Sequence, residues 1–135
     1  NGVFDILHRG HISYLKQSQT LGNCLLVALN SDDSTRRLNK GEDRPINSLE
    51  DRMSIVASLQ SVAFVTWFEE DNPLSLIESC KPDILVKGGD WPVDKIVGAS
   101  LVKSWGGKVL SIPFAYERST TKMLETIRGK IRLKL

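Results

Sequence analysis

Both histidines of the 135-residue chain lie in the short stretch "HRGH", in which His8 and His11 flank Gly10. The stretch follows the apolar "VFDIL" and precedes a helix-like segment, so we expect it at a turn from strand to helix. The first N–H groups of a helix lack partners within the helix and favour a phosphate. Gly10 would let an anion approach the backbone, and both imidazoles could donate to that anion. The alternative is one capping histidine and one surface histidine.

A second helix start of this kind is predicted at "STTKM", where Ser119, Thr120 and Thr121 precede Lys122 after an apolar run. Helix capping alone would explain serine and threonine here. Two phosphate-binding helix starts, each following a strand, would nevertheless suit a triphosphate held between them.

The segment "RRLNKGEDRPINSLEDR", residues 36–52, carries five basic residues against four acidic ones. This near balance is typical of a solvated loop and helix surface. The functional alternative is that Lys40 and Arg44, on a loop with glycine and proline, fold over a phosphate.

The stretch "VKGGDW", residues 86–91, ends a predicted strand with a glycine pair. Glycines there permit close approach of a ligand to the backbone. Trp91 could stack on a base, and Asp90 could bind a sugar hydroxyl or help to hold a metal. A tight turn with a packed tryptophan is the alternative.

The elements that must position these residues alternate along the chain. Four runs of strand length are apolar on both faces, as in a buried parallel sheet: 24–30, 63–68, 83–88 and 108–114. Five helix-like segments are predicted at 10–22, 48–62, 72–80, 93–107 and 119–131. The pattern predicts an α/β fold with a doubly wound parallel sheet in one domain, residues 1–135. Ligands of such sheets bind beyond the carboxyl ends of the strands, where the candidate loops fall.

Composition narrows the class of protein. A net charge of +2 and a hydrophobic share of 41% argue against a nucleic-acid partner and for an ordinary globular protein. We find no apolar run of membrane-spanning length and no signal peptide, and we expect a cytoplasmic protein. Cys24 and Cys80 fit no zinc or redox spacing and are expected to be reduced and largely buried. There is neither a serine–histidine–acid set nor a G-x-x-x-x-G-K-[ST] loop.

Taken together, "NGVFDILHRGH" and "RSTTKM" resemble the signatures of the H-x-G-H nucleotidyltransferase superfamily, which has a Rossmann-like fold. The stretches "NSDDSTRRLNKGEDRPINSLEDR", "LVKGGDW" and "VGASLVKSWGGKVLSIPF" are similar to the D-glycero-β-D-manno-heptose 1-phosphate adenylyltransferase family. The resemblance covers nearly the whole chain. It implies that ATP and heptose 1-phosphate, with Mg²⁺, give ADP-heptose and pyrophosphate for lipopolysaccharide synthesis. It also implies a first strand running into "NG", largely missing from this sequence.

The resemblance assigns roles to matching residues. The catalytic residues would be His8, His11, Lys40 and Arg44. The nucleotide-binding residues would be Phe4, Asp5, Gly10, Arg52, Gly88, Asp90, Trp91, Ser119, Thr120 and Thr121. No protein ligand to a metal is implied. The expected partners are ATP and the sugar 1-phosphate, without nucleic acid or membrane, and relatives imply a homo-oligomer such as a dimer.

Two other functions stay open from the sequence. The related CTP:glycerol-3-phosphate cytidylyltransferases share the histidine motif and the "STT", but they carry an arginine where this chain has Phe114. That difference and Lys87 favour the heptose enzyme, although the choice of base rests on the resemblance. The other alternative is a nucleotide-binding sensor without turnover. Arg118, where the superfamily often has an apolar residue, receives no role.

Overall fold

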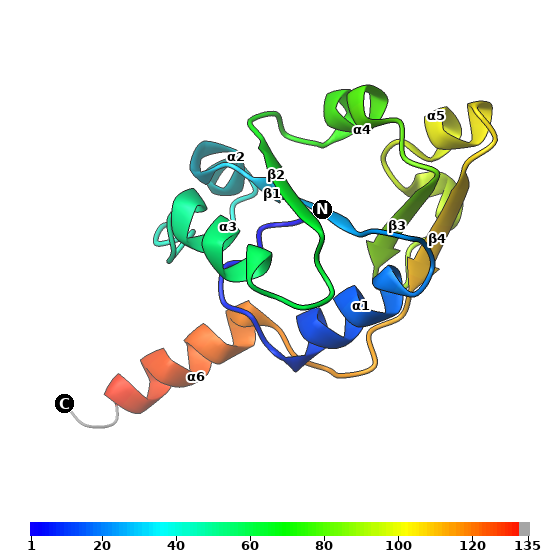
Figure 1. Cartoon of the computed structure of the whole chain (residues 1–135). Coiled ribbons are helices and arrows are strands. Elements are labelled where there is room, and N and C mark those ends of the chain that lie inside the picture. Colours follow the sequence, from blue (N-terminus) through cyan, green and yellow to red (C-terminus); the bar gives the residue numbers. More distant parts are fainter. Residues whose placement is uncertain (133–135) are drawn as a thin grey trace.

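Strands and helices alternate along the chain in the computed structural model, which describes residues 1–132 (Figure 1). The strands are β1 (Leu26–Asn30), β2 (Phe64–Phe68), β3 (Ile84–Gly88) and β4 (Lys108–Ile112). The helices are α1 (Arg9–Gln19), α2 (Asp32–Arg37), α3 (Leu49–Ala57), α4 (Leu74–Cys80), α5 (Ala99–Ser104), α6 (Thr120–Arg132) and the short 3-10 helix η1 (Val93–Lys95). The predicted α/β fold class is confirmed.

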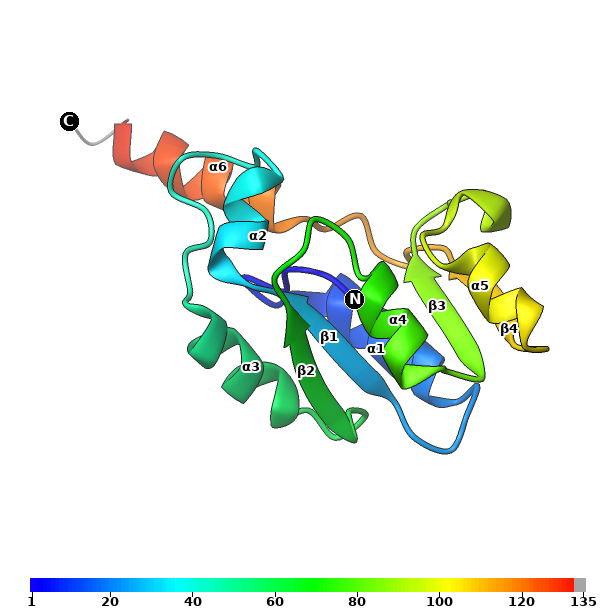
Figure 2. The same cartoon turned by 90° about the horizontal axis from the view of Figure 1, so that it is seen from above.

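Every strand pairing is parallel among the described residues. β1 pairs with β2, and β3 pairs with β4, so the carboxyl ends within each pair lie at one edge. Gly2 continues the sheet beside β1, because its N–H donates to the carbonyl of Ala28 and its own carbonyl accepts from the N–H of Asn30. Figure 2 shows β1 and β2 side by side, and Figure 1 shows β3 next to β4.

A groove of about 480 Å³ lies between the two strand pairs. It is lined by residues 26–28 of β1, residues 84–86 of β3, Asn1 and part of α4.

Two apolar clusters hold the sheet from its opposite faces. Val86 packs with the cluster under α1 and α3, whereas its neighbour Leu85 packs with the cluster under α4 and α5. Successive side chains of a strand point to opposite faces, so the two clusters form separate layers. The core residues with no exposed surface include Leu29 and Val56 in the first layer and Val102 in the second. These layers fix the strand ends that carry the candidate loops.

The structure corrects the sequence analysis in two helical regions. α2 lies between the predicted strand at 24–30 and the predicted helix at 48–62, where the sequence analysis expected no helix. Its polar sequence begins after Ser31, whose hydroxyl accepts from the N–H of Ser34 at 3.0 Å. The helix expected over 93–107 is divided into η1 and α5 at Gly98, which has a φ of 86°. A residue with this φ leaves the right-handed helix, and glycine adopts it without steric cost.

The cysteines also differ from expectation, because Cys24 and Cys80 are both exposed. Both cysteines line the groove between the strand pairs, and the other described residues leave them exposed there. None of the helices within residues 1–132 is long and apolar enough to span a bilayer.

Candidate active site

His8 and His11 form a stacked pair at the start of α1. His8 is the N-cap residue, and its Nδ1 accepts from the N–H of Gly10 at 3.1 Å. Nδ1 of His11 accepts from the N–H of His8 at 3.3 Å, and the two ring centroids are 3.8 Å apart. The predicted turn into the first helix is present. The sequence "HRGH" forms this turn because both imidazoles accept hydrogen bonds from N–H groups that the start of the helix leaves unpaired.

The hydrogen bonds of this pair fix where its protons lie. Because each Nδ1 accepts a backbone N–H, each neutral ring carries its proton on Nε2. Burial, and then the charge of Arg118, lowers the pKa of His8. Burial, followed by His8 and Lys40, lowers the pKa of His11 to about 4. At neutral pH the pair is therefore uncharged and has two Nε2–H donors for an anion.

Two tight contacts hold the pair in place. A Cβ added at Gly10 would lie 3.0 Å from the His8 ring, so a side chain there would displace that ring. Phe4 has a φ of 52°, and its ring lies 5.3 Å from that of His11. A non-glycine residue in this region is strained, and such strain clusters at functional sites. The structure thus places Phe4 and Gly10 around the histidines.

The start of α6 adjoins the segment that leads to the histidines. The Thr120 hydroxyl donates to the carbonyl of Ile6 at 2.9 Å, across 114 residues of chain. Ser119 caps α6 by accepting from the N–H of Lys122 at 3.1 Å, while Thr121 is exposed. The segment before α6 also covers the start of α1, since the Arg9 guanidinium lies 3.9 Å from the centre of the Tyr116 ring. The two helix starts singled out from the sequence are therefore brought together.

The glycine turn after β3 lies beside the same helix. The Tyr14 hydroxyl on α1 donates to the carbonyl of Val86 at 3.2 Å, and burial raises the pKa of Tyr14 to about 12. A Cβ at Gly88 would lie 3.0 Å from the Phe114 ring, so this turn and that ring exclude a larger residue.

Asp90 and Trp91 complete this loop at the surface. Trp91 is 52% exposed, and its backbone N–H donates to the Ser111 hydroxyl at 3.2 Å. Asp90 is exposed and has no ion pair with any residue of 1–132. Both side chains are therefore exposed at the carboxyl end of β3, and their contact with a nucleotide stays a prediction.

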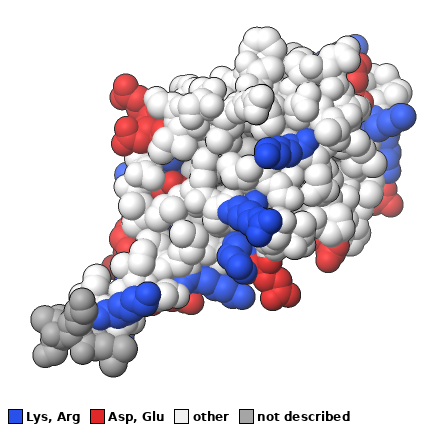
Figure 3. Space-filling model, turned by 60° about the horizontal axis from the view of Figure 1, so that its bottom comes forward, with Lys and Arg blue, Asp and Glu red and all other residues white. Residues whose placement is uncertain are grey.

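Basic side chains gather over this region. Figure 3 shows lysine and arginine side chains along the middle of the face that carries α1 and the base of α6. Lys40 lies close enough to act on His11, and its own pKa is lowered by burial and then by Arg44. Arg128 of α6 pairs with Asp43 at the surface, which ties α6 to the Lys40 loop.

Arg44 and Asp5 form a buried pair rather than an open contact with ligand. Nε of Arg44 donates to Oδ2 of Asp5 at 2.8 Å, and the arginine side chain is only 4% exposed. Asp5 also accepts from the N–H groups of Ile46 and Asn47, at 2.8 and 2.9 Å. Asp5 thus anchors the loop that carries Lys40. Nη1 of Arg44 is buried and has no hydrogen-bond partner in the described chain.

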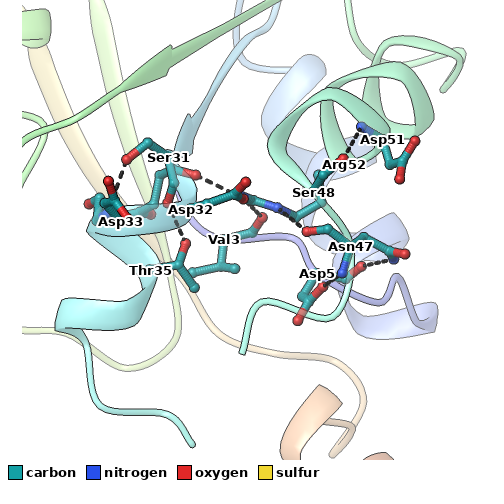
Figure 4. Close-up of polar contacts among 12 residues, drawn as sticks. Val3, Asp5, Ser31, Asp32, Asp33, Thr35, Asn47, Ser48, Asp51 and Arg52 are labelled. Carbon is teal, nitrogen blue, oxygen red and sulfur yellow. Dashed lines mark hydrogen bonds and ion pairs between the residues drawn. The ribbon is translucent and has the colours of Figure 1, made fainter. Parts of the chain in front are cut away.

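Arg52 is likewise turned inward (Figure 4). It has no exposed surface, and it donates to the carbonyls of Val3, Asn30 and Asn47 and to the carboxylate of Asp32. The sequence predicted that Arg52 binds the nucleotide. In the structure, its N–H groups instead donate to acceptors within the chain. We therefore reassign Arg52 as a residue that positions the segments around the site.

Two features of the site were missing from the sequence assignment. Lys87, used there only to compare families, precedes the glycine turn, and its pKa is lowered by burial and then by the charge of Lys40. Its place beside a glycine pair at a strand end was the available signal. The contact between Arg9 and Tyr116 had no such signal, since only the folded chain brings these residues together.

No group of three or more histidine, cysteine or acidic side chains suited to a metal occurs in residues 1–132. Mg²⁺ is commonly held by substrate phosphates with one or two carboxylates rather than by a protein cage. Among the carboxylates of this region, Asp5 is already engaged by three donors, whereas Asp90 is open.

Sequence comparisons agree with this geometry. The family model described as "Cytidylyltransferase-like" matches residues 1–130. A protein of Bordetella bronchiseptica named D-beta-D-heptose 1-phosphate adenylyltransferase is 55% identical over 98% of this chain and 79% of its own length. The "Bifunctional protein HldE" of Alcanivorax borkumensis is 52% identical over 96% of this chain, which spans only 27% of that longer protein.

A solved structure gives the same result. The crystal structure of the lipopolysaccharide core biosynthesis protein from Thermoplasma volcanium is 33% identical, with a TM-score of 0.66 over 87% of this chain and 93% of that one. The chain therefore belongs to the cytidylyltransferase-like family and, within it, to the family of its heptose 1-phosphate adenylyltransferase relatives.

Proposed function

We propose that this chain is a nucleotidyltransferase that joins the AMP part of ATP to a heptose 1-phosphate, giving ADP-heptose and pyrophosphate. The observation that carries this proposal is the hydrogen bond from Thr120 to Ile6, which sets the start of α6 against the stacked His8–His11 pair. The 55% identical relative named D-beta-D-heptose 1-phosphate adenylyltransferase supports the nucleotide and the acceptor.

The chemistry requires no protein nucleophile. A sugar 1-phosphate is largely ionised at neutral pH, since a second phosphate pKa is about 6. One of its oxygens attacks the α-phosphorus in line, a new P–O bond forms, and the bond to pyrophosphate breaks. The protein must align the reactants and stabilise negative charge that spreads over the phosphoryl oxygens.

The described residues supply these functions from two helix starts. The Nε2–H groups of His8 and His11 would donate to the phosphoryl oxygens, with the N–H groups of α1 beside them. Ser119 and Thr121, at the start of α6, would receive the departing pyrophosphate end. Lys40 adds positive charge near His11. Trp91 and Asp90, exposed after β3, would receive the adenosine part.

Mg²⁺ supplies additional positive charge to phosphates when it is bound, and we expect it to enter with ATP. A cytoplasmic location and a homo-oligomeric state also stay predictions.

The test is pyrophosphate release with Mg²⁺, with ATP or CTP as donor and heptose 1-phosphate or glycerol 3-phosphate as acceptor. We expect release with ATP and the heptose only, and a loss of at least about 100-fold in kcat for His8→Ala with its circular dichroism unchanged. Release with CTP and glycerol 3-phosphate only would move the chain to the cytidylyltransferase alternative. Nucleotide binding without any release would favour the sensor. An unaffected turnover of the His8→Ala variant would contradict the mechanism.

A further inference from the structure

Lys87 lies at the carboxyl edge of the sheet, on the face opposite to α1. Leu85, two residues earlier on β3, packs into the layer under α4 and α5, and residues two apart on a strand share a face. Lys87 precedes the last residue of the strand and is half-buried. Its ammonium group therefore approaches the site from the other face than the histidines, which belong to α1.

The two lysines on this side have no ion-pair partner. Neither Lys87 nor Lys40 forms an ion pair within the described part of the chain. Lys40 is exposed and Lys87 is half-buried; partial desolvation lowers the pKa of each lysine, and the charge of Lys40 lowers that of Lys87 further. Arg44 lowers the pKa of Lys40 as well; its Nε is paired with Asp5, whereas its buried Nη1 has no acceptor. The nearby carboxylate of Asp5 already accepts three hydrogen bonds.

Such a cluster calls for an anion from outside the chain. Desolvating an ammonium group is costly unless a negative charge or acceptor replaces its water, and like charges held together add to that cost. A phosphate dianion placed between Lys40 and Lys87 would relieve both effects.

The position of the lysines indicates which phosphate group of the reaction they bind. In an in-line transfer the attacking and leaving oxygens lie on opposite sides of the phosphorus. The start of α6, held to Ile6 by Thr120, is expected to take the leaving pyrophosphate on the α1 side. The anion at Lys87 would then be on the attacking side.

We propose that Lys87, together with Lys40, binds the phosphate group of the acceptor substrate and holds it as the nucleophile. This inference rests on the proposed function, because it names a residue that recognises the acceptor of that reaction. The contact makes Lys87 an acceptor-binding residue and leaves the histidines as the groups that act on the transferred phosphoryl group.

The test is the Lys87→Met variant, which keeps the length of the side chain and removes its charge. We expect the KM for heptose 1-phosphate to rise at least tenfold while the KM for ATP changes less than twofold. Lys87→Arg should recover part of the loss. Lys108→Met is the matched control, because Lys108 lies at the opposite end of the same strand pair and is exposed. Its kinetic constants should equal those of the unchanged protein.

Calorimetry without ATP keeps this test separate from that of the function. The unchanged protein should bind heptose 1-phosphate, and Lys87→Met should bind it at least tenfold more weakly, whether or not turnover is detected. The proposal is overturned if the loss falls on ATP, if Lys87→Met binds the acceptor unchanged, or if the unchanged protein binds no heptose 1-phosphate. Absence of turnover with intact, Lys87-dependent binding would instead refute the proposed function alone.

Discussion

At the scale of single residues, the stacked histidines make the free protein sensitive to mild acid. His11 has a pKa of about 4 against a usual 6.5, so between these pH values the unfolded chain binds more protons than the folded one. The free energy of unfolding should therefore fall as pH drops from about 6.5 to about 4, by at most about 3 kcal/mol for a partly exposed group. Urea denaturation at pH 7, 5.5 and 4.5 measures this fall.

The His11→Asn variant is the control for this effect, because its amide oxygen can accept from the His8 N–H without titrating. Its stability should change less over the same pH range. An equal slope in the two proteins would show that other groups cause the acid sensitivity. The carboxylates with lowered pKa values, Asp43 and Asp94, lose their contribution only below their usual value of 3.8.

The candidate residues near the strand ends could be identified from the sequence, whereas the hydrogen-bond partners of buried side chains could not. His8, His11 and Gly10 were found because their spacing suits a helix start, and the structure places them there. Arg52 was assigned to the nucleotide because the family resemblance links a basic residue at this position to phosphate binding. Its acceptors come from three other segments, which only the folded chain assembles.

At the scale of elements, the join between α6 and the start of α1 should control turnover. Thr120→Val removes the hydroxyl that donates to Ile6 and should cost about 1 kcal/mol in stability. Because small displacements of phosphate-binding groups are costly, we expect kcat/KM to fall at least about tenfold. Steady-state pyrophosphate release measures the loss, and Thr120→Ser should restore most of it.

Thr126→Val offers the same chemical change on the same helix. The Thr126 hydroxyl donates to the carbonyl of Lys122 within α6, away from the join. This variant should keep kcat/KM within about twofold, since the lost bond lies within one exposed helix. Equal losses for the two variants would mean that α6 matters through its helicity and not through its contact with the histidine segment.

The pattern of apolar residues predicted most strands and helices correctly. The exceptions depend on helix capping and on the conformation of one glycine. Runs such as 63–68 and 83–88 were confirmed to within a residue, because buried parallel strands are apolar on both faces. α2 was missed because its six residues are polar and depend on the cap at Ser31. The single helix expected over 93–107 was wrong because Gly98 adopts a positive φ inside it.

At the scale of the whole molecule, Arg52 connects the first residues, the end of β1 and the loop before α3. Arg52→Met would leave the carbonyls of Val3, Asn30 and Asn47 without these donors in a dry environment. We expect a loss of about 3–5 kcal/mol, a large part of the total stability of a domain. The midpoint of urea denaturation measures it.

Arg36→Met provides the comparison, because Arg36 pairs with Asp33 at the surface of α2. Such exposed pairs contribute at most about 1 kcal/mol. An Arg52→Met protein with unchanged stability and weakened ATP binding would instead restore the nucleotide-binding role that the sequence predicted.

The charges of Lys40 and Lys87, which form no ion pair within residues 1–132, also oppose stability to phosphate binding. In the free protein these like charges repel one another at the carboxyl edge of the sheet, and a bound anion would relieve the repulsion. A stability–activity trade-off is therefore built into this cluster. In variants selected only for resistance to heat, we expect these lysines to be replaced early by uncharged residues. Such variants would gain thermal stability and lose affinity for phosphates.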